Sequence, residues 1–302
     1  MNRVCILGGS GFVGRHLIAN LSRRGIRCRV LTHHPQRHAS LRVLPGTELV
    51  KSPSLDPAFL ISQFEGCDAV INLIGILNEA RGKASFRQIH VELVDTIVAA
   101  AIKARVGRLL HMSALHASAD APSHYLRTKA QGEDAVHRAA SADFHVTSFR
   151  PSVIFGPGDG FLNRFAALLR LTPGVFPLAC PDARFQPVSV EDVVGAFVES
   201  LDNHKTFGER YDLCGPKTYT LRETVAYVAR VLDKPVCIIG LNDTLSYLQA
   251  LSLEFVPGKP FSLDNYRSLQ IDSVCDKGFP EVFGITPGSL EEIAPDYLRP
   301  HS

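Results

Sequence analysis

The first half of the chain alternates short apolar runs with longer stretches of helical periodicity. Runs rich in β-branched and aliphatic residues predict strands over residues 3–9, 27–32, 47–52, 68–75, 108–114 and 144–151. Helices are predicted between them, over residues 14–25, 56–66 and 85–107 and in a helix that holds residues 125–140. Near-continuous apolar strands separated by helices are typical of a parallel sheet covered on both faces. We therefore predict an α/β fold built on a doubly wound parallel sheet.

The composition changes after Pro151. Segments rich in proline and glycine predict a smaller, loop-rich C-terminal lobe; they are residues 155–160, 173–187 and 257–261. A helix over 189–201, with a capping box from Ser189 to Asp192, and a strand over 209–215 are expected to return to the sheet. The predicted division is a sheet domain and a smaller lobe: residues 1–155, rejoined by residues 186–215, and residues 156–302.

Charge and cysteine content exclude several classes of protein. A formal net charge of +2 without a basic run argues against nucleic-acid binding. Seven cysteines, scattered and without a CxxC pair, argue against a disulfide framework or a metal site and are typical of a reducing compartment. No stretch is long and apolar enough to predict a membrane span. Because the chain enters a strand-like run directly, without a signal-peptide pattern, we expect a cytoplasmic location.

The first predicted strand ends in the glycine loop GGSGFVG, which places Gly8, Gly11 and Gly14 three residues apart. Glycines at this spacing permit a tight turn, let backbone amides approach a pyrophosphate and let the following helix pack closely on the strand. We expect Gly11 to adopt a positive φ. The loop between strand and helix predicts a dinucleotide site of the Rossmann type. Its expected contacts are Gly8, Ser10, Gly11, Phe12, Val13 and Gly14.

The residues after the second strand indicate which dinucleotide binds. An NAD site usually has an acid there, on the ribose 2′-hydroxyl. This chain has no Asp or Glu before Glu48, and the segment reads Thr32, His33, His34, Pro35, Gln36, Arg37. A guanidinium can bind a 2′-phosphate, which a carboxylate would repel. We predict NADP(H) rather than NAD(H), with contacts from Thr32 and above all Arg37, and with His33 and His34 as the next candidates for the 2′-phosphate.

Together these features resemble the short-chain dehydrogenase/reductase superfamily in its extended, atypical form. The matching pieces are GGSGFVG, DAVINLIG, YLRTK, RPSVIFGPGD, FQPVSVEDVV and YDLCGP. HMSAL, YLRTKAQGE and PDARFQPVSVEDV are similar to the subgroup of the 39-kDa (NDUFA9-type) accessory subunit of respiratory complex I. The resemblance implies further cofactor contacts at Ile74, Pro151 and Val153. In that subgroup the implied role is tight NADP(H) binding.

The resemblance assigns a catalytic pair to Tyr125 and Lys129. The tyrosine is the implied general acid or base, and the lysine depresses its pKa and holds the nicotinamide ribose. Positions i and i+4 share one helix face, and a nearby cation favours the phenolate. Both residues are therefore expected to be catalytic and to contact the cofactor.

Two positions depart from the family pattern. The substrate-orienting Ser/Thr slot holds Ala114, and Ser113 stands one residue earlier as the remaining catalytic candidate. The slot of the asparagine that supports the lysine holds His90, which could replace it or only pack.

Three functions remain open. The leading interpretation is an NADP(H)-dependent oxidoreductase acting on a small-molecule carbonyl or alcohol. The second is a non-catalytic, NADPH-holding assembly or stability factor, associated peripherally with a membrane enzyme complex at the inner membrane. The third is a sugar-nucleotide epimerase or dehydratase, which the fold suits but the missing Ser/Thr disfavours.

Overall fold

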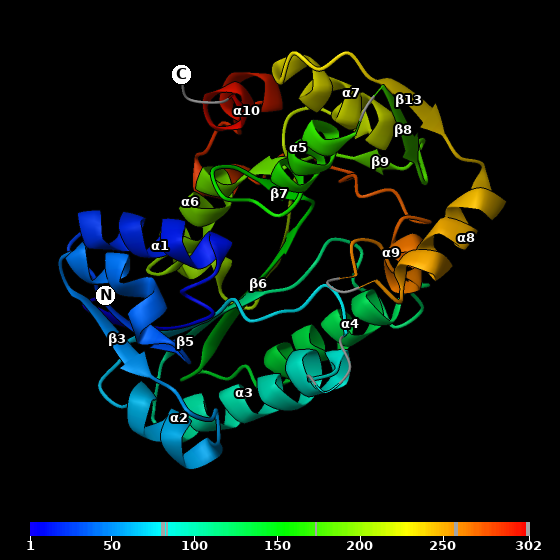
Figure 1. The fold of residues 1–302 in the computed structure, drawn as a ribbon. Coiled ribbons are helices and arrows are strands. Elements are labelled where there is room, and N and C mark those ends of the chain that lie inside the picture. The colour runs from blue at the N-terminus through cyan, green and yellow to red at the C-terminus, as the bar shows by residue number, and fades with distance from the viewer. Residues whose placement is uncertain (80–81, 83, 173, 257–258, 300–302) are drawn as a thin grey trace.

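A seven-stranded parallel sheet forms the centre of the computed structural model, which describes residues 1–79, 82, 84–172, 174–256 and 259–299 (Figure 1). The strand order is β11-β6-β5-β4-β1-β2-β3, and every neighbouring pair is parallel. The strands are β1 (Arg3–Leu7), β2 (Arg27–Thr32), β3 (Thr47–Lys51), β4 (Ala69–Asn72), β5 (Arg108–Met112), β6 (His145–Pro151) and β11 (Arg210–Leu213). The predicted strands are therefore present, most of them shorter than expected.

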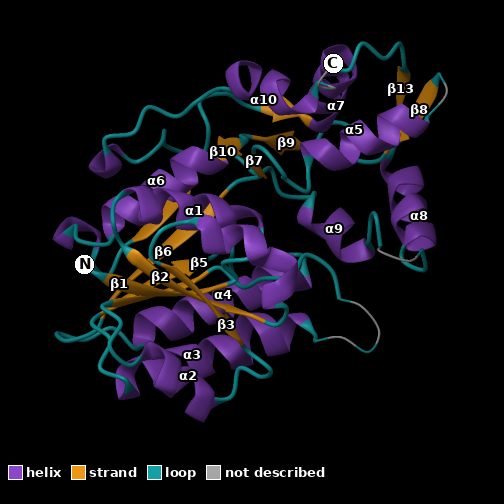
Figure 2. Cartoon of the chain, turned by 60° about the vertical axis from the view of Figure 1, so that its left-hand side comes forward, coloured by secondary structure: helices purple, strands orange, loops and turns teal. Residues whose placement is uncertain are grey.

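Helices cover both faces of this sheet (Figure 2). They are α1 (Phe12–Arg23) and α6 (Val190–Ser200) on one face, and α2 (Pro57–Phe64), α3 (Leu93–Lys103) and α4 (His124–Arg138) on the other. Alternate residues of β1 serve the two faces: Val4 packs with the first core cluster and Cys5 with the second. This alternation follows from the period of a strand. The predicted doubly wound sheet is confirmed.

A smaller lobe follows the carboxyl end of β6. Its helices are α5 (Leu162–Leu171), α7 (Leu221–Val231), α8 (Asp243–Leu253), α9 (Leu263–Ser268) and α10 (Leu290–Leu298). Its short strands pair as β7 (Ile154–Phe155) with β10 (Val188–Ser189), β8 (Val175–Leu178) with β13 (Cys237–Gly240), and β9 (Arg184–Phe185) with β12 (Tyr219–Thr220). Helices α5, α7 and α10 share one apolar core. Within the described ranges no helix has the length and apolar content needed to cross a bilayer.

Local structure departs from the sequence expectations at three places. The helix predicted over 85–107 begins with a π turn at Gln88–Glu92, and a 3₁₀ segment occupies Pro35–Val43, where no element was predicted. The capping box at α6 was wrong in its second half. Ser189 accepts a hydrogen bond from the Glu191 N–H at 3.1 Å, but the Asp192 carboxylate accepts the N–H of Gly288 at 2.9 Å. Asp192 is therefore hydrogen-bonded to the C-terminal lobe and does not complete a capping box at the start of α6.

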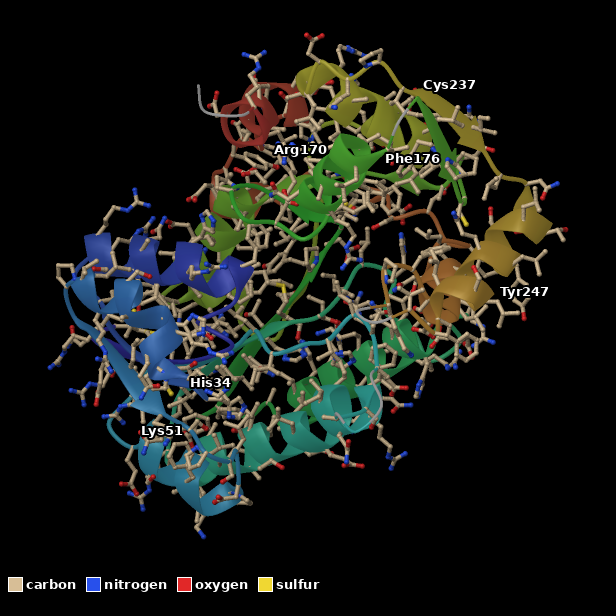
Figure 3. The ribbon with its side chains drawn as sticks, in the orientation of Figure 1. His34, Lys51, Arg170, Phe176, Cys237 and Tyr247 are labelled. Carbon is tan, nitrogen blue, oxygen red and sulfur yellow. A yellow bond between two sulfur atoms is a disulfide. The ribbon has the colours of Figure 1, made fainter. Side chains whose placement is uncertain are left out.

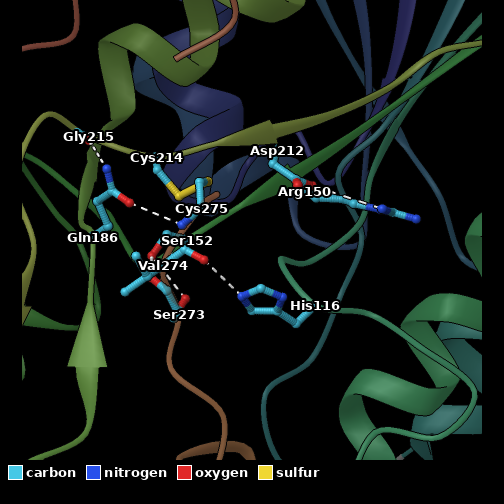
Figure 4. Close-up of a disulfide and its surroundings, with 10 residues drawn as sticks. All are labelled: His116, Arg150, Ser152, Gln186, Asp212, Cys214, Gly215, Ser273, Val274 and Cys275. Atoms are coloured by element: carbon cyan, nitrogen blue, oxygen red, sulfur yellow. Dashed lines mark hydrogen bonds and ion pairs between the residues drawn. A yellow bond between two sulfur atoms is a disulfide. The ribbon is translucent and has the colours of Figure 1, made fainter. Parts of the chain in front are cut away.

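The structure contains a disulfide between Cys214, at the end of β11, and Cys275 (Figure 4). This corrects the expectation that no cysteines pair, because scatter along the sequence says nothing about proximity in the fold. The segment around Cys275 is held by several further contacts. The Ser273 carbonyl accepts the Ser152 hydroxyl at 2.8 Å, and the Val274 carbonyl lies 3.0 Å from His116 Nε2. The disulfide therefore ties this segment to the carboxyl-terminal edge of the sheet.

Replacing Cys275 by serine is expected to lower the free energy of unfolding by about 2–4 kcal/mol, because the crosslink restricts the unfolded chain. The pair is separated by 61 residues, a long loop for such a restriction. Denaturant unfolding of both proteins, each with and without reductant, measures the effect. Reductant should shift the wild-type midpoint alone. A wild-type midpoint that ignores reductant would contradict the pairing.

Candidate active site

The glycine loop lies at the carboxyl edge of the sheet, where β1 meets α1. Gly8 adopts a φ of +76°, and a Cβ at this position would lie 2.9 Å from the carbonyl carbon of Leu73, after β4. A Cβ on Gly14 would lie 2.4 Å from Gly9 Cα, so only glycine lets α1 pack on the loop. Gly11 has a φ of −75°, which corrects the expectation of a positive value there. Gly8, and not Gly11, is the residue of this loop that has the left-handed backbone conformation.

Helix α1 begins directly behind this loop with exposed backbone donors. Gly11 is its N-cap; no side chain caps it, and no acid occupies its first turn. Phe12 and Val13 are the first helical residues, so their amides point toward the loop side of the helix. The uncapped N–H groups and the helix dipole suit an anionic group such as a pyrophosphate.

A pocket of about 260 Å³ adjoins the loop. It is lined by six of the expected residues, Gly8, Ser10, Thr32, His33, His34 and Ile74, and by His38, which was not predicted. No carboxylate lines it. In the lining, the Thr32 hydroxyl donates a hydrogen bond to the Ser10 hydroxyl, with the two oxygens 3.5 Å apart.

Arg37 is exposed and does not line this pocket. His34, the residue that precedes the 3₁₀ segment, lines the pocket instead (Figure 3). The Arg37 backbone N–H donates to the His34 carbonyl at 3.0 Å, which places Arg37 in the first turn of that segment. Pro35 was the sequence signal for this 3₁₀ segment, because proline is favoured at the first position of a helix.

Tyr125 and Lys129 both lie on α4 and near the loops that follow β4 and β5. Burial raises the pKa of Tyr125 to about 12, so the phenol is protonated at neutral pH. Tyr125 Oη makes no hydrogen bond within the described part of the chain, which leaves it available to a ligand. Its ring packs edge-on against His90, with centroids 5.6 Å apart.

The Lys129 ammonium donates a hydrogen bond to the Met112 carbonyl at the end of β5. Burial lowers the pKa of Lys129 to about 8, although the charge of Glu133 opposes this shift. Gly75 lies against it: a Cβ at Gly75 would be 3.8 Å from Lys129 Nζ and 3.7 Å from His90 Nε2. Glycine therefore keeps space open above the lysine.

Ser113 and Ala114 face different surroundings. The Ser113 side chain is 2% exposed, and its buried hydroxyl has no hydrogen-bond partner among the described residues. Burial raises the pKa of Glu133, but the hydrogen bonds from Arg150 and the charges of Arg150 and Arg210 bring it below its ordinary value. Ala114 instead packs in a small apolar cluster with Tyr125. The residue after β5 that packs against Tyr125 is therefore an alanine, which offers a methyl group and no hydroxyl.

His90 uses both ring nitrogens within the protein. Nε2 accepts the Ile76 N–H at 3.1 Å, and Nδ1 lies 3.1 Å from Thr128 Oγ1. The Thr128 hydroxyl is itself directed at carbonyls in the first turn of α4, so His90 Nδ1 is the donor. Burial, with the Lys129 charge, lowers the pKa of His90 to about 3 and keeps it neutral. His90 therefore fastens the turn after β4 to α4 and has no free nitrogen for a proton relay.

Asp264 is a site residue that the sequence did not reveal. Its carboxylate, on α9, accepts the backbone N–H groups of His124 at 2.7 Å and Tyr125 at 3.0 Å. The C-terminal lobe thereby caps the helix that carries the candidate acid. Of the other two predicted cofactor residues, Pro151 is the last residue of β6 and Val153 follows it, at the same edge of the sheet. The Pro151 carbonyl accepts the Leu115 N–H at 3.1 Å and the Val153 carbonyl the Val188 N–H at 3.0 Å.

Known proteins resemble the chain in sequence over most of its length. The Arabidopsis thaliana mitochondrial NADH dehydrogenase (ubiquinone) 1 alpha subcomplex subunit 9 is 28% identical over 89% of this chain and 68% of its own length. The mouse protein of the same name is 29% identical over 98% of this chain and 79% of its own. A Caulobacter vibrioides ceramide reductase is 31% identical over 65% of this chain and 59% of its own. The expected resemblance to the complex I subunit group is confirmed.

Solved structures share the fold. The Escherichia coli NADPH-dependent quinone oxidoreductase QOR2, complexed with NADPH, superposes with a TM-score of 0.74 at 18% identity, covering 98% of this chain and 99% of that one. MoeE5 in complex with UDP-glucuronic acid and NAD gives a TM-score of 0.66 at 19% identity, over 80% and 86% of the two chains. The pattern that defines the NAD dependent epimerase/dehydratase family matches residues 4–214, which include the loop and the Tyr–Lys pair. The chain therefore belongs to the NAD dependent epimerase/dehydratase family.

Proposed function

We propose that the protein is an NADP(H)-dependent oxidoreductase that reduces a carbonyl group on a lipophilic substrate. The observation that carries the proposal is Tyr125, whose phenol makes no hydrogen bond to a described residue and which precedes Lys129 by one turn of α4, near the end of β5. A protonated phenol is the form that can give a proton to a carbonyl oxygen. Burial keeps the Tyr125 phenol in this form at neutral pH.

The residues present suit a dinucleotide. A Cβ would fill the space at Gly8 and Gly14, the α1 terminus offers unbonded amides, and the adjoining pocket has no carboxylate. Gly8, Gly11 and the first turn of α1 would hold the pyrophosphate, and the pocket beside Thr32 the adenosine half. When bound, the nicotinamide supplies the hydride that reduces the carbonyl carbon.

The chain's own residues supply the proton and orientation. Tyr125 donates its phenolic proton to the substrate oxygen as negative charge develops there. The Lys129 ammonium, one turn further along α4, stabilises the resulting phenolate. Asp264 and His90 hold α4 and the turn after β4 in place, so they are positioning residues. Ser113 remains a weaker candidate, because its hydroxyl is buried, while Ala114 is the residue that packs with Tyr125.

The substrate class is argued from relatives whose names specify one. One is a ceramide reductase; another, from Stigmatella aurantiaca, is a ketoreductase of a farnesyl dihydroquinoline oxide and is 29% identical over 56% of this chain. Both named substrates carry a long hydrocarbon portion. The methyl group of Ala114 beside Tyr125 is compatible with such a substrate. We therefore place a carbonyl on a long-chain or prenylated molecule in this site.

NADPH is expected to bind at least tenfold more tightly than NADH. A charge-assisted hydrogen bond to the 2′-phosphate contributes about 1.5–3 kcal/mol, and each 1.4 kcal/mol is a factor of ten. Calorimetric titration of the two nucleotides tests this. His34→Ala should weaken NADPH and leave NADH unchanged, and Arg37→Ala should have a smaller effect, because Arg37 does not line the pocket. Equal affinities for the two nucleotides in the wild type would contradict the assignment.

A second function has specific support. Ala114 in the Ser/Thr slot, and relatives named as subunits of a respiratory complex, favour a protein that holds NADPH as a structural ligand of a membrane enzyme complex. This alternative predicts that NADPH raises the melting temperature while Tyr125→Phe changes nothing. Ala114→Ser separates the two functions further, since it should raise turnover only in a working reductase.

A further inference from the structure

The sheet carries a second pocket, at the edge opposite the glycine loop. Its volume is about 340 Å³, and it forms where β1 and β2 begin and the 3₁₀ segment ends. Arg3 and Arg27, the first residues of these two strands, are paired in register. Because β1 is five residues long, the pocket lies about 16 Å from the loop at the other end of that strand. The dinucleotide site and this pocket are therefore separate.

Four arginines are among the residues that line this pocket: Arg3, Arg27, Arg29 and Arg42. Its one carboxylate, Glu48, lies 3.4 Å from Arg29 Nε. Four positive charges against one negative charge make the lining strongly attractive to an anion.

Most of these guanidinium groups have no partner inside the protein. Arg29 is occupied, since its NH1 also donates to the Gln63 carbonyl at 2.6 Å. Among the residues described, Arg3, Arg27 and Arg42 form no side-chain ion pair. The nearby carboxylate of Asp68 is used instead by the backbone N–H groups of Asn2 and Arg3, at 2.6 and 2.9 Å.

A buried hydroxyl in the same lining also lacks a partner. Thr47 Oγ1 is screened from solvent and makes no hydrogen bond to any described residue. A buried polar group without a partner costs free energy, and such groups in native proteins usually have an explanation. An oxyanion bound among the arginines would accept a hydrogen bond from this hydroxyl once a small shift of the lining uncovers Thr47 Oγ1, which has no exposed surface in the structure.

We propose that this pocket binds the phosphate group of a phosphate ester. The guanidinium fork matches two phosphate oxygens, and a phosphate offers enough acceptors for several arginines and a hydroxyl at once. The volume is within the range of small-molecule sites and exceeds what one phosphate group needs, so an ester carrying a further moiety fits. The same chemistry belongs to a soluble phosphate ester and to the head group of an anionic lipid. The site is independent of the proposed reductase activity.

The test uses the full chain saturated with NADPH, so that the glycine loop does not capture the probe. Glycerol phosphate is titrated by calorimetry, and binding to phosphatidylcholine vesicles with and without phosphatidic acid is measured by flotation. Arg27→Glu and Arg42→Glu change exposed side chains, and Arg230→Glu, on α7 in the lobe, is the matched charge control. Thr47→Val removes the hydroxyl with little change of shape.

Each arginine variant should weaken binding at least tenfold, Thr47→Val at least threefold, and Arg230→Glu not at all. Arginine-dependent binding of glycerol phosphate identifies a soluble ester as the ligand. Arginine-dependent binding of phosphatidic acid vesicles alone identifies a lipid head group. The proposal is overturned if neither probe binds the wild type, or if binding ignores Arg42→Glu and Thr47→Val.

Discussion

Replacing Tyr125 by phenylalanine is expected to lower kcat by about 10²–10⁴, the range for losing a positioned general acid. NADPH affinity should barely change, because the lost hydroxyl makes no hydrogen bond within the described chain. The measurement is steady-state turnover of a long-chain ketone together with calorimetric titration of NADPH. The fold should tolerate the variant, since its ring contacts with Phe86 and His90 need no hydroxyl.

Lys129→Ala should be measured beside Tyr125→Phe, because the two variants are expected to differ in their effect on NADPH affinity. Lys129→Ala removes the cation that stabilises the phenolate and holds the ribose, so kcat and NADPH affinity should fall together. His124→Ala is the matched control, because that side chain is exposed at the start of α4 and directly precedes Tyr125. A Tyr125→Phe enzyme with wild-type kcat would contradict the role of the phenol and leave the nucleotide-holding function.

Replacing Gly11 by valine is expected to abolish NADPH binding while the protein stays folded. Gly11 has an ordinary φ of −75°, and a Cβ there would meet only the Gly8 carbonyl oxygen, at 3.1 Å. The added side chain would instead occupy the approach to the α1 amides. Circular dichroism and calorimetric titration separate folding from binding.

Gly14→Ala provides the contrast within the same loop. Its Cβ would lie 2.4 Å from Gly9 Cα, so backbone must move and the melting temperature should fall. If Gly11→Val still bound NADPH at wild-type affinity, the pyrophosphate would not lie at this loop. If Gly14→Ala left the melting temperature unchanged, the close packing of α1 on Gly9 would be wrong.

The sheet and the glycine loop could be predicted because their signals are local. A buried strand requires a continuous apolar run, and the spacing of Gly8, Gly11 and Gly14 follows from how closely a helix can approach a strand. The Tyr125–Lys129 pair is equally local, since four residues make one helical turn. The identity of the positive-φ glycine was not predictable, because any glycine of the loop can adopt that conformation.

Contacts between distant segments account for what the sequence did not reveal. Asp264 reaches the N–H of Tyr125 across 139 residues, and Cys275 reaches Cys214 across 61. Arg37 lies in the 3₁₀ segment that begins at Pro35 and does not line the pocket, whereas His34, which precedes that segment, does. In each case the missing information was how one element packs on another.

The most direct test of the reductase function follows a labelled hydride. The protein is incubated with NADPH deuterated at the transferable C4 position and a ceramide-like long-chain ketone, and the alcohol is analysed by mass spectrometry. The proposed mechanism predicts one deuterium on the carbinol carbon with wild-type protein and at most about one-hundredth of that rate with Tyr125→Phe, although both proteins bind NADPH. Tight NADPH binding without label in any alcohol, by wild type and variant alike, would contradict it.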